Sequence, residues 1–549
     1  MKLRRTNLQK LKTETFDVMV VGGGINGAVS AAALAAKGAN VALIDKGDFA
    51  SFTSQQSSNL AWGGIKYMES YEFPLVRKLC QCRNHLIESY PSTVKEIRFF
   101  TTLTRGFRHH RFLVFMGSLL YWIIGNFFTR PPKLLSRKTI DDSEPIIKTD
   151  EAVGGVEYSD AYLHDNDARF TFGFIRSAMN YGCVAVNYIE STGADRQADG
   201  SWVFSLKDQE SGETFTTKAS YVVNACGPYA DAHNETTEEK TDCRHVFSKG
   251  IHLIVPKLTP NKRVLTFFAD DGRMFFVIPM GPRTCIGTTD TRVDRPESFV
   301  THEDRRFVLE NINKRLNLQK ELTEDDIIAE RCGVRPLVVQ GAGDTDRDWV
   351  QLSRKHQVVS SVETGHVSIY GGKLTDCLNV GDEVCESLTK MGLKLGYPQQ
   401  KWYGEPTDDV RAEFMHQAEL MGLDDYTHPD SSEPLSSRFW RRYGQNAFSL
   451  LESIRREPAM AEVLIEGAEY TRCEIWLTRR YEMVTRLEDF LRRRSKIELV
   501  TRPEALKQAE GLREACEIFF EADAEKRLAE YYELKDNDPS RKTLLARAS

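Results

Sequence analysis

The stretch that decides the fold of this chain is Val18-Met-Val-Val-Gly-Gly-Gly-Ile-Asn-Gly27, followed by Asn40-Val-Ala-Leu-Ile-Asp45. An apolar run ends in Gly22-x-Gly24-x-x-Gly27, an alanine-rich stretch follows, and a second apolar run ends in an acid eighteen residues after the last glycine. This order predicts a βαβ unit in which Gly22 permits a tight turn, Gly24 admits a pyrophosphate and Gly27 packs helix on strand. The helix N-terminus would face the phosphates, and the acid would face the ribose. The stretch therefore predicts an adenine dinucleotide site.

Length and composition are those of a multidomain globular protein. At 549 residues the chain exceeds what one hydrophobic core holds, so two or three domains are expected. A net charge of −6 gives no reason to expect nucleic-acid binding. The eleven cysteines include no Cys-x-x-Cys pair, and no histidine cluster completes a metal site. We therefore expect reduced thiols, a cytoplasmic location and no bound metal.

One uncharged apolar stretch, Phe112–Phe128, is bracketed by basic residues. Its seventeen residues are fewer than the about 20 that typically span a bilayer. It is interpreted as a buried helix or as a helix that lies in a membrane interface, with its flanking cations near anionic headgroups; a helix that spans the bilayer is the least favoured alternative. The apolar face would consist of Leu113, Met116, Leu120, Ile124 and Phe127, which recur at helical spacing. Attachment to the inner face of the cytoplasmic membrane is therefore a hypothesis.

The rest of the chain alternates between strand-like and helix-like segments. Residues 47–71 are rich in serine and glycine, which suits a loop around a cofactor, and residues 72–150 are predicted to be mostly helical. Strands are expected within 181–227, at 251–255, 273–279 and 284–287, and as a hairpin at 358–370, with a helix at 304–316. From about residue 403 a helical region rich in Arg and Glu follows. Its basic runs 438–442 and 492–494 could form solvated helix faces or a basic patch that faces a membrane, and we interpret them as solvated helix faces.

These segments predict an α/β protein with a discontinuous Rossmann-like dinucleotide-binding domain at residues 1–80, 151–230 and 331–400. A β-rich substrate or cap domain would take residues 81–150 and 231–330. A C-terminal helical domain would take residues 401–549.

A series of further motifs runs in one order along nearly the whole chain. They are Gly47-Asp-Phe-Ala-Ser-Phe-Thr-Ser54, Ser57-Ser58, Gly63-Gly-Ile-Lys-Tyr-Met-Glu69, Asn224-Ala-Cys-Gly-Pro228, Lys249-Gly-Ile-His252, Ile286-Gly-Thr-Thr-Asp290, Cys332-Gly-Val-Arg-Pro-Leu337, Ser353-Arg354, Gly371-Gly-Lys-Leu-Thr375 and Thr485-Arg-Leu-Glu-Asp-Phe-Leu-Arg-Arg-Arg494. This series resembles the FAD-dependent glycerol-3-phosphate dehydrogenases. The resemblance implies FAD as the cofactor and hydride transfer to flavin N5 from a secondary alcohol of a polyol phosphate. The implied reaction converts sn-glycerol 3-phosphate to dihydroxyacetone phosphate and passes the electrons to a membrane quinone.

The resemblance also assigns roles to residues. It places FAD contacts at Gly22, Gly24, Gly27, Asp45, Lys46, Thr53, Ser54, Ser58, Gly63, Gly64, Ala225, Gly227, Gly371, Gly372, Lys373 and Leu374. His252 is the implied base for the hydroxyl proton, although a histidine on an apolar strand is more commonly a core residue. A phosphate is best bound by arginine, so Arg335 and Arg354 are the implied ligands, and surface salt bridges are the plainer interpretation. Lys66 is a third cation and the second candidate for the base; Tyr67 and Arg273 complete the substrate set.

Several positions depart from the family's motifs. The usual Ser-Lys-Leu-Ile-His-Gly-Gly is here Ser58-Asn-Leu-Ala-Trp-Gly-Gly64, so Asn59 and Trp62 replace a lysine and a histidine. After Gly371-Gly-Lys-Leu-Thr375 the usual Thr-Tyr-Arg is replaced by Asp376, Cys377 and Leu378. The departures leave the FAD prediction intact but keep the substrate open. Two alternatives therefore stand: an amine or 2-hydroxy-acid oxidoreductase in which Arg335 binds a carboxylate and oxygen accepts the electrons, and a flavin-binding protein without catalysis. A homodimer is also left open.

Overall fold

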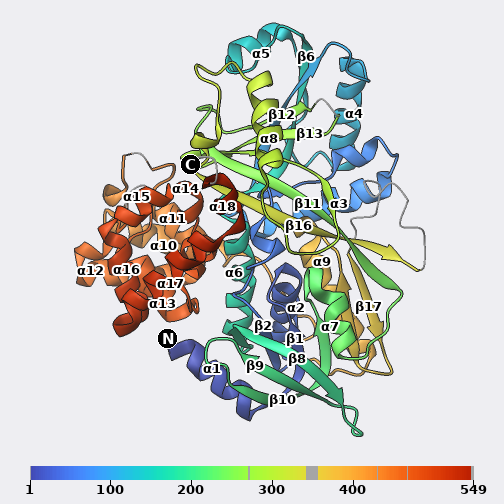
Figure 1. Ribbon diagram of the computed structural model, residues 1–549, viewed down its shortest axis with the longest axis vertical. Helices are drawn as coiled ribbons and strands as arrows, with labels where there is room; N and C mark the ends of the chain where they lie inside the picture. Colours follow the sequence, from blue (N-terminus) through green and yellow to red (C-terminus); the bar gives the residue numbers. More distant parts are fainter. Residues whose placement is uncertain (1, 270–271, 342–355, 430, 466–467, 546–549) are drawn as a thin grey trace.

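The computed structural model describes residues 2–269, 272–341, 356–429, 431–465 and 468–545. It contains a mostly parallel sheet, a second and larger mixed sheet, and a C-terminal group of helices packed beside both (Figure 1). The predicted α/β class, with a Rossmann-like domain, a β-rich region and a C-terminal helical region, is confirmed.

The first sheet is built around the predicted βαβ unit. Its parallel strands lie in the order β18 (His366–Tyr370), β10 (Thr214–Asn224), β1 (Thr15–Val21), β2 (Val41–Asp45) and β7 (Val184–Asn187). Antiparallel strands β17 (Gln357–Ser361), β8 (Ile189–Arg196) and β9 (Trp202–Asp208) complete it. Every residue of β2 is buried, as expected for a parallel strand covered on both faces. Helix α2 (Ile25–Ala36) has eleven buried residues, because its alanines let it lie close against the sheet.

The second sheet carries two long strands paired along their length, β11 (Cys243–Pro256) and β16 (Ala329–Gln340). The other strands are β3 (Leu60–Ala61), β4 (Val94–Thr104), β5 (Lys133–Leu135), β6 (Ala152–Leu163), β12 (Val264–Phe268), β13 (Met274–Met280), β14 (Arg283–Gly287) and β15 (Thr291–Val293). Helix α8 (His302–Arg315) packs against this sheet, and its Val308 and Ile312 join the sheet's core. The strands and helix predicted between residues 251 and 316 are therefore present.

One sequence prediction is wrong in this region. Within the supposedly mostly helical residues 72–150, Val94–Thr104 forms β4, which pairs with β6 over its whole length. Its β-branched and aromatic residues suit a strand with burial on both faces. The strand was missed because it lies between the helices α3 (Phe73–Ser89) and α4 (Arg111–Ile124), so the change from a helical to a strand pattern of apolar residues was not recognised. The predicted dinucleotide-binding domain includes β6 and most of β16, but both strands belong to the second sheet.

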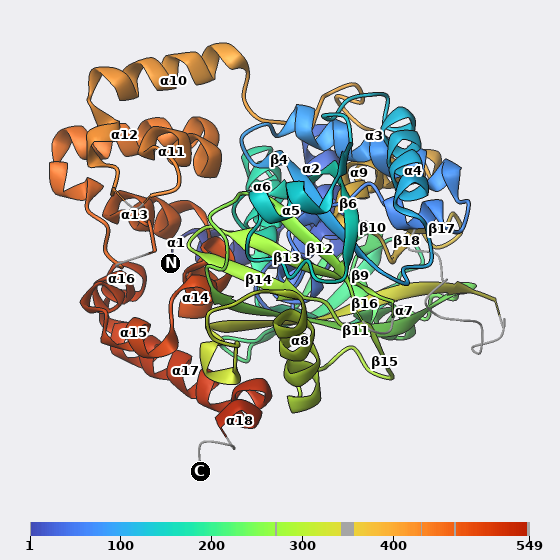
Figure 2. The ribbon, with the colours of Figure 1, turned by 90° about the horizontal axis from the view of Figure 1, so that it is seen from above.

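The C-terminal helices form a layer on one side of the molecule, and α4 lies on the opposite side (Figures 1 and 2). They are α10 (Asp408–Leu420), α11 (Leu435–Tyr443), α12 (Phe448–Arg456), α13 (Arg472–Tyr481), a π-helical turn at Asp489–Arg494, α14 (Ile497–Val500), α15 (Pro503–Gln508), α16 (Glu510–Phe520), α17 (Ala524–Asn537) and α18 (Pro539–Leu545). None of the helices in the described residues is long and apolar enough to cross a membrane.

The basic runs of this region are a second correction. Arg438, Arg442 and Arg492–Arg494 are all buried, with exposures of 0–6%, rather than lying on solvated helix faces. Each reaches carboxylates or carbonyl groups, most of them distant in sequence, and Arg494, for example, pairs with Asp48. Burial of an arginine depends on such distant partners, so the local sequence did not reveal it.

Candidate active site

A cavity of about 550 Å³ opens where the parallel strands of the first sheet end. Its walls include the residues that directly follow β1, β2, β10 and β18, namely Gly22, Lys46, Ala225 and Gly371. The carboxyl ends of parallel strands are the usual ligand-binding edge of such a sheet. The far wall is formed by the second sheet, through residues of β11, β13 and β16.

The glycines at one end of the cavity are required by geometry. Gly22 has a φ of +103°, and a Cβ there would lie 2.4 Å from the carbonyl oxygen of Ala225. A Cβ on Gly27 would lie 1.8 Å from the carbonyl oxygen of Gly22, so only glycine lets α2 approach β1 this closely. Gly24 is the N-cap of α2, and the helix N-terminus therefore meets the cavity. This arrangement fits a pyrophosphate held by backbone N–H groups.

The acid at the end of β2 is fixed by the backbone. Asp45 Oδ2 accepts a hydrogen bond from Gly23 N at 2.7 Å, and Oδ1 accepts one from Gly47 N at 2.8 Å. Burial raises the pKa of Asp45 to about 6, so the group is mainly ionised at neutral pH. Beside it, Lys46 Nζ lies 3.4 Å from the centre of the Tyr229 ring. Together the glycines and Asp45 form a site that fits the two phosphates and a ribose of a dinucleotide.

The second sheet brings a histidine and an arginine to the same cavity. His252 on β11 is 3% exposed and lines the cavity; neither ring nitrogen has a hydrogen-bond partner among the described residues. Burial, followed by Arg335 and Arg331, lowers the pKa of His252 to about 3. The imidazole is therefore neutral over the physiological pH range, and it can accept a proton.

Arg335 on β16 lies across the neighbouring strand β11. A Cβ on Gly250 would be 2.1 Å from Arg335 Nη2, so this glycine makes room for the guanidinium. Arg335 Nη1 donates to Asp290 Oδ1 at 3.3 Å and Nη2 donates to Thr288 Oγ1 at 3.3 Å, with 29% of the side chain exposed. A half-buried, permanently charged and planar donor beside a neutral imidazole suits an anionic substrate.

The other predicted residues divide into those that line the cavity and those that do not. Asp45, Lys46, Thr53, Ser54, Ser58, Tyr67, Ala225, Gly227, Gly371, Gly372, Lys373 and Leu374 line it with Gly22, Gly24, His252 and Arg335. Lys373 Nζ donates a hydrogen bond to Tyr67 Oη at 2.8 Å, so these two side chains meet in the wall of the cavity. Gly27, Gly63, Gly64, Lys66 and Arg273 are not among the lining residues, and Lys66 is exposed. Arg354 lies outside the described residues.

The departures from the family's motifs have separate structural explanations. Asp376 pairs with His356 Nδ1 at 2.7 Å, and Leu378 is buried in the core. Asn59 Oδ1 accepts a hydrogen bond from Arg331 Nη1 at 3.1 Å. Of these replacements only Trp62 lines the cavity. The substitutions near Gly371–Thr375 therefore serve packing and ion pairing, and Trp62 is the one that bears on the ligand.

Sequence reasoning missed several lining residues, among them Asn26, Gln56, His233, Phe276 and Thr288. Asn26 stands inside the glycine motif, and its Nδ2 donates to Gly371 O at 3.0 Å, a contact between segments 345 residues apart. His233 and Phe276 carry no local motif, so only the fold brings them to the cavity.

Two protein-family models match successive parts of the chain. Residues 17–366 match the family model described as "FAD dependent oxidoreductase", and residues 399–527 match the "C-terminal domain of alpha-glycerophosphate oxidase". The protein is thus a FAD-dependent oxidoreductase, and the dinucleotide predicted from its glycine motif is FAD.

Individual relatives narrow the class. The chain is 30% identical to glycerol-3-phosphate dehydrogenase 2 of Mycobacterium bovis over 89% of its length and 82% of that protein. It is 28% identical to the aerobic glycerol-3-phosphate dehydrogenase of Staphylococcus saprophyticus, over 90% and 89% of the two chains. Its fold resembles the glycerol-3-phosphate dehydrogenase of Bacillus halodurans complexed with FAD, with a TM-score of 0.73 at 23% identity over 99% and 97% of the two chains. The chain belongs to the FAD-dependent glycerol-3-phosphate dehydrogenase family.

Proposed function

We propose that this enzyme oxidises sn-glycerol 3-phosphate at C2 to dihydroxyacetone phosphate and passes the electrons to a quinone at a membrane surface. The observation that carries the proposal is the presence of a neutral His252 and a cationic Arg335 in one cavity with the dinucleotide turn at Gly22 and Gly24. When bound, FAD supplies the hydride acceptor for oxidation of the alcohol carbon.

The substrate roles follow from the chemistry of the side chains. Arg335 would bind the phosphate, because its planar guanidinium offers parallel N–H donors, and Asp290 and Thr288 hold its orientation. His252 would take the hydroxyl proton at a ring nitrogen as the hydride leaves C2. We keep Arg354 and Arg273 as proposed substrate ligands. Lys66 stays the second candidate for the base.

The membrane part of the proposal is supported by the surface of α4. Large apolar side chains are exposed along it and just beyond it: Phe112 by 56%, Leu113 by 60%, Met116 by 45%, Leu120 by 41%, Ile123 by 49% and Phe127 by 57%. Such a contiguous apolar surface suits a helix that lies in a membrane interface. The inner face of α4 is linked to the residue that follows the cavity-lining Trp62, since Tyr121 Oη donates to Asp160 Oδ2 at 2.8 Å and Asp160 Oδ1 accepts from Gly63 N at 2.9 Å. A membrane quinone would then be near the flavin, and the enzyme would act at the inner face of the cytoplasmic membrane.

Anaerobic reduction of the bound flavin tests the substrate. We expect sn-glycerol 3-phosphate to bleach the visible flavin absorption, while glycerol, lactate and glycine do not. Bleaching by an amine or a 2-hydroxy acid, but by no polyol phosphate, would overturn the proposal and favour the alternative class. The reduced enzyme is then mixed with vesicles that contain a quinone or with oxygen; reoxidation by oxygen alone would contradict the quinone step.

A further inference from the structure

The loop between β2 and β3 forms one side of the cofactor cavity. Its lining residues are Ser51, Phe52, Thr53, Ser54, Gln56, Ser57 and Ser58. Apart from a single 3-10 turn at Thr53–Gln55, residues 48–59 form no helix or strand. The conformation of this loop, which we call the cofactor loop (residues 48–59), therefore depends on contacts from elsewhere in the chain.

Three consecutive arginines of the C-terminal region supply many of those contacts. Arg494 donates from both Nη1 and Nη2 to the carboxylate of Asp48, each at 2.8 Å. Arg493 Nε donates to Asp48 Oδ2 at 2.6 Å, and its Nη1 donates to Gln55 Oε1 at 3.4 Å. Arg492 Nη2 donates to Gln56 Oε1 at 3.1 Å. Each of the three arginines thus binds the cofactor loop, from positions more than 430 residues away in sequence.

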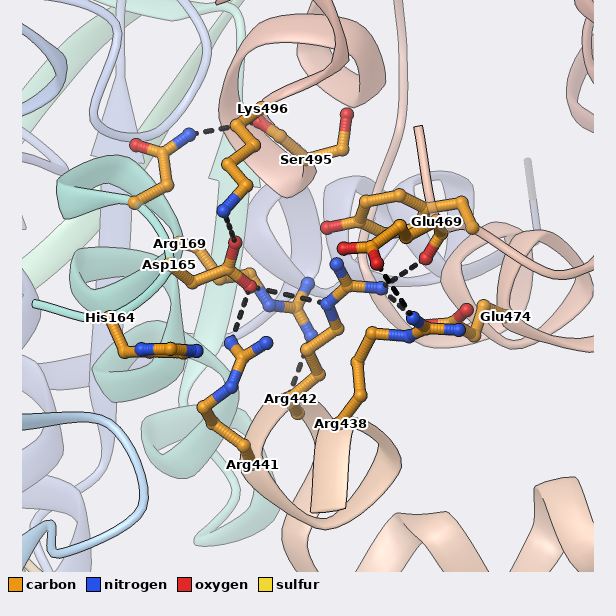
Figure 3. A network of polar contacts seen from close by, with 12 residues as sticks. His164, Asp165, Arg169, Arg438, Arg441, Arg442, Glu469, Glu474, Ser495 and Lys496 are labelled. Atoms are coloured by element: carbon orange, nitrogen blue, oxygen red, sulfur yellow. Dashed lines mark hydrogen bonds and ion pairs between the residues drawn. The ribbon is translucent and has the colours of Figure 1, made fainter. Parts of the chain in front are cut away.

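The arginines are themselves held by the N-terminal end of α6 (Asp167–Asn180). Asn166 Nδ2 donates to the carbonyl oxygens of Arg492 and Ser495, at 3.1 and 2.9 Å. The next residue, Asp167, accepts a hydrogen bond from Ser57 N at 2.7 Å. The first turn of α6 therefore binds both the C-terminal segment and the cofactor loop. Beside it, Asp165 binds Arg441, Arg442 and Lys496 (Figure 3).

Charge and burial make this contact specific. Asp48 is 1% exposed, and although its burial raises the pKa, Arg494 and Arg493 outweigh that effect and keep the pKa below its usual value. A buried carboxylate held by two guanidinium groups has one favourable geometry, which sets where the loop begins. None of the described residues after Thr375 lines the cavity, so these arginines reach it through its walls, mainly through the cofactor loop and by one bond from Arg492 Nη2 to the Glu330 carbonyl on β16.

We propose that Arg492–Arg494 of the C-terminal region are positioning residues for FAD, which hold the cofactor loop in the conformation that receives it. Binding of FAD and docking of the C-terminal segment are then linked, and each stabilises the other. The inference uses only the FAD assignment and is independent of the substrate proposed above.

The test compares two Arg→Gln variants of the full-length holoenzyme. Arg492→Gln removes the donor to Gln56, together with the 3.3 Å bond to the Glu330 carbonyl, and within the part of the chain that the structure describes no carboxylate lies within ion-pair distance of Arg492. The matched control is Arg176→Gln on α6. It removes a half-buried arginine that joins the same two regions through Glu482 and the Arg442 carbonyl and does not contact residues 48–59. The measurements are the rate of FAD release after dilution, followed by flavin fluorescence, and hydrogen exchange of residues 48–59.

We expect Arg492→Gln to raise the FAD dissociation constant roughly tenfold or more, as for one lost hydrogen bond to a charged group. Exchange in the cofactor loop should increase, Arg492→Lys should restore part of the affinity, and Arg176→Gln should release FAD like wild type. Arg494→Lys, which keeps the charge but loses the paired donors to Asp48, is a second variant on the same loop. The proposal fails if Arg492→Gln binds FAD as wild type does, or if Arg176→Gln weakens FAD and loosens the loop equally.

Discussion

His252 is a base whose charge is set by its position in the fold. It lies on β11 between β14 and β16, buried and with two arginines nearby, and each of these features disfavours the imidazolium. An ordinary histidine would be partly protonated at pH 6, whereas this one stays neutral down to about pH 3. The imidazole is therefore already in its proton-accepting form at physiological pH, while the same low pKa makes it a weaker base than an ordinary histidine.

We predict that His252→Gln slows flavin reduction by about 10²–10⁴-fold, the usual contribution of a general base. Because the folded pKa of His252 is depressed, protonation of His252 should not contribute between pH 5.5 and 8. Stopped-flow reduction of wild type and variant should therefore give a constant ratio of rates across that range. A ratio that falls towards one as the pH drops would show that His252 titrates there, and an unchanged rate would move the base elsewhere, with Lys66 the next candidate.

We predict that Arg335→Lys weakens binding of the phosphorylated substrate by roughly 1.5–3 kcal/mol, because lysine keeps the charge but loses the planar pair of donors. FAD content should be unchanged. The matched control is Arg263→Lys: Arg263 also pairs with a carboxylate, that of Glu144, but it does not line the cavity and has no proposed role in substrate binding. Titration of the oxidised enzyme with dihydroxyacetone phosphate measures the difference, and equal affinity in wild type and Arg335→Lys would give Arg335 a structural role only.

Helix α4 shows how a single element combines two faces. Tyr121 and Ser118 are buried, while Leu113, Met116 and Ile123 are exposed. Ile124, which the spacing places on the apolar outer face, is instead half-buried against the core around Tyr121, and Ile123 is exposed in its place. The flanking Arg108 and Arg130 pair with Glu69 and Glu96, at 2.6 and 3.1 Å, so less of their charge is available to lipid headgroups than the sequence indicates.

We predict that replacing both Leu113 and Met116 with Glu lowers binding of the enzyme to anionic liposomes roughly tenfold or more, since apolar burial carries the attachment. Dye-linked turnover should be unchanged, because both side chains face away from the core. The matched control replaces Leu420 and Leu534, which are 74% and 46% exposed on α10 and α17, with Glu. Equal sedimentation of both double variants with liposomes would contradict the membrane proposal. For the wild-type enzyme, added salt should weaken liposome binding only slightly.

The elements that the sequence predicted well are those whose cause is local. The glycines and Asp45 act within one βαβ unit, so their spacing alone predicted β1, α2 and β2. The strand β4 was missed because it lies between two helices, and its alternating hydrophobic pattern does not stand out from their helical pattern. The buried arginines at 492–494 were misjudged for a different reason: their partners Asp48, Gln55 and Gln56 stand at the other end of the chain, and a basic run looks the same whether it is solvated or paired.

At the scale of the whole molecule, buried charges join the C-terminal helices to the segment between β6 and α6. Asp165 binds Arg441 Nη1 at 2.7 Å, Arg442 Nε at 3.2 Å and Lys496 Nζ at 3.7 Å (Figure 3). Burial raises the pKa of Asp165, but these three cations outweigh it and lower the pKa well below its usual value. Arg442 continues the network to Glu474 at 2.7 Å within the C-terminal region. These ion pairs form only while the carboxylates are ionised, so acid should weaken the interface between the C-terminal helices and the rest of the protein.

We predict that Asp165→Asn destabilises the protein by about 3–5 kcal/mol, because it leaves buried cations without their shared carboxylate. Since the folded pKa of Asp165 lies below its unfolded value, the stability that it contributes is present above about pH 4 and is lost as the pH falls through the folded value. Urea unfolding at pH 7 should therefore show a lower midpoint for Asp165→Asn, and the gap from wild type should narrow below pH 4. Asp199→Asn, which breaks the exposed pair with Lys218, is the control and should unfold like wild type. If the gap is absent at pH 7, the C-terminal helices are held by apolar packing and not by this carboxylate. If the gap is present at pH 7 but the same at pH 3, the contribution of Asp165 does not depend on its ionisation, which contradicts the prediction.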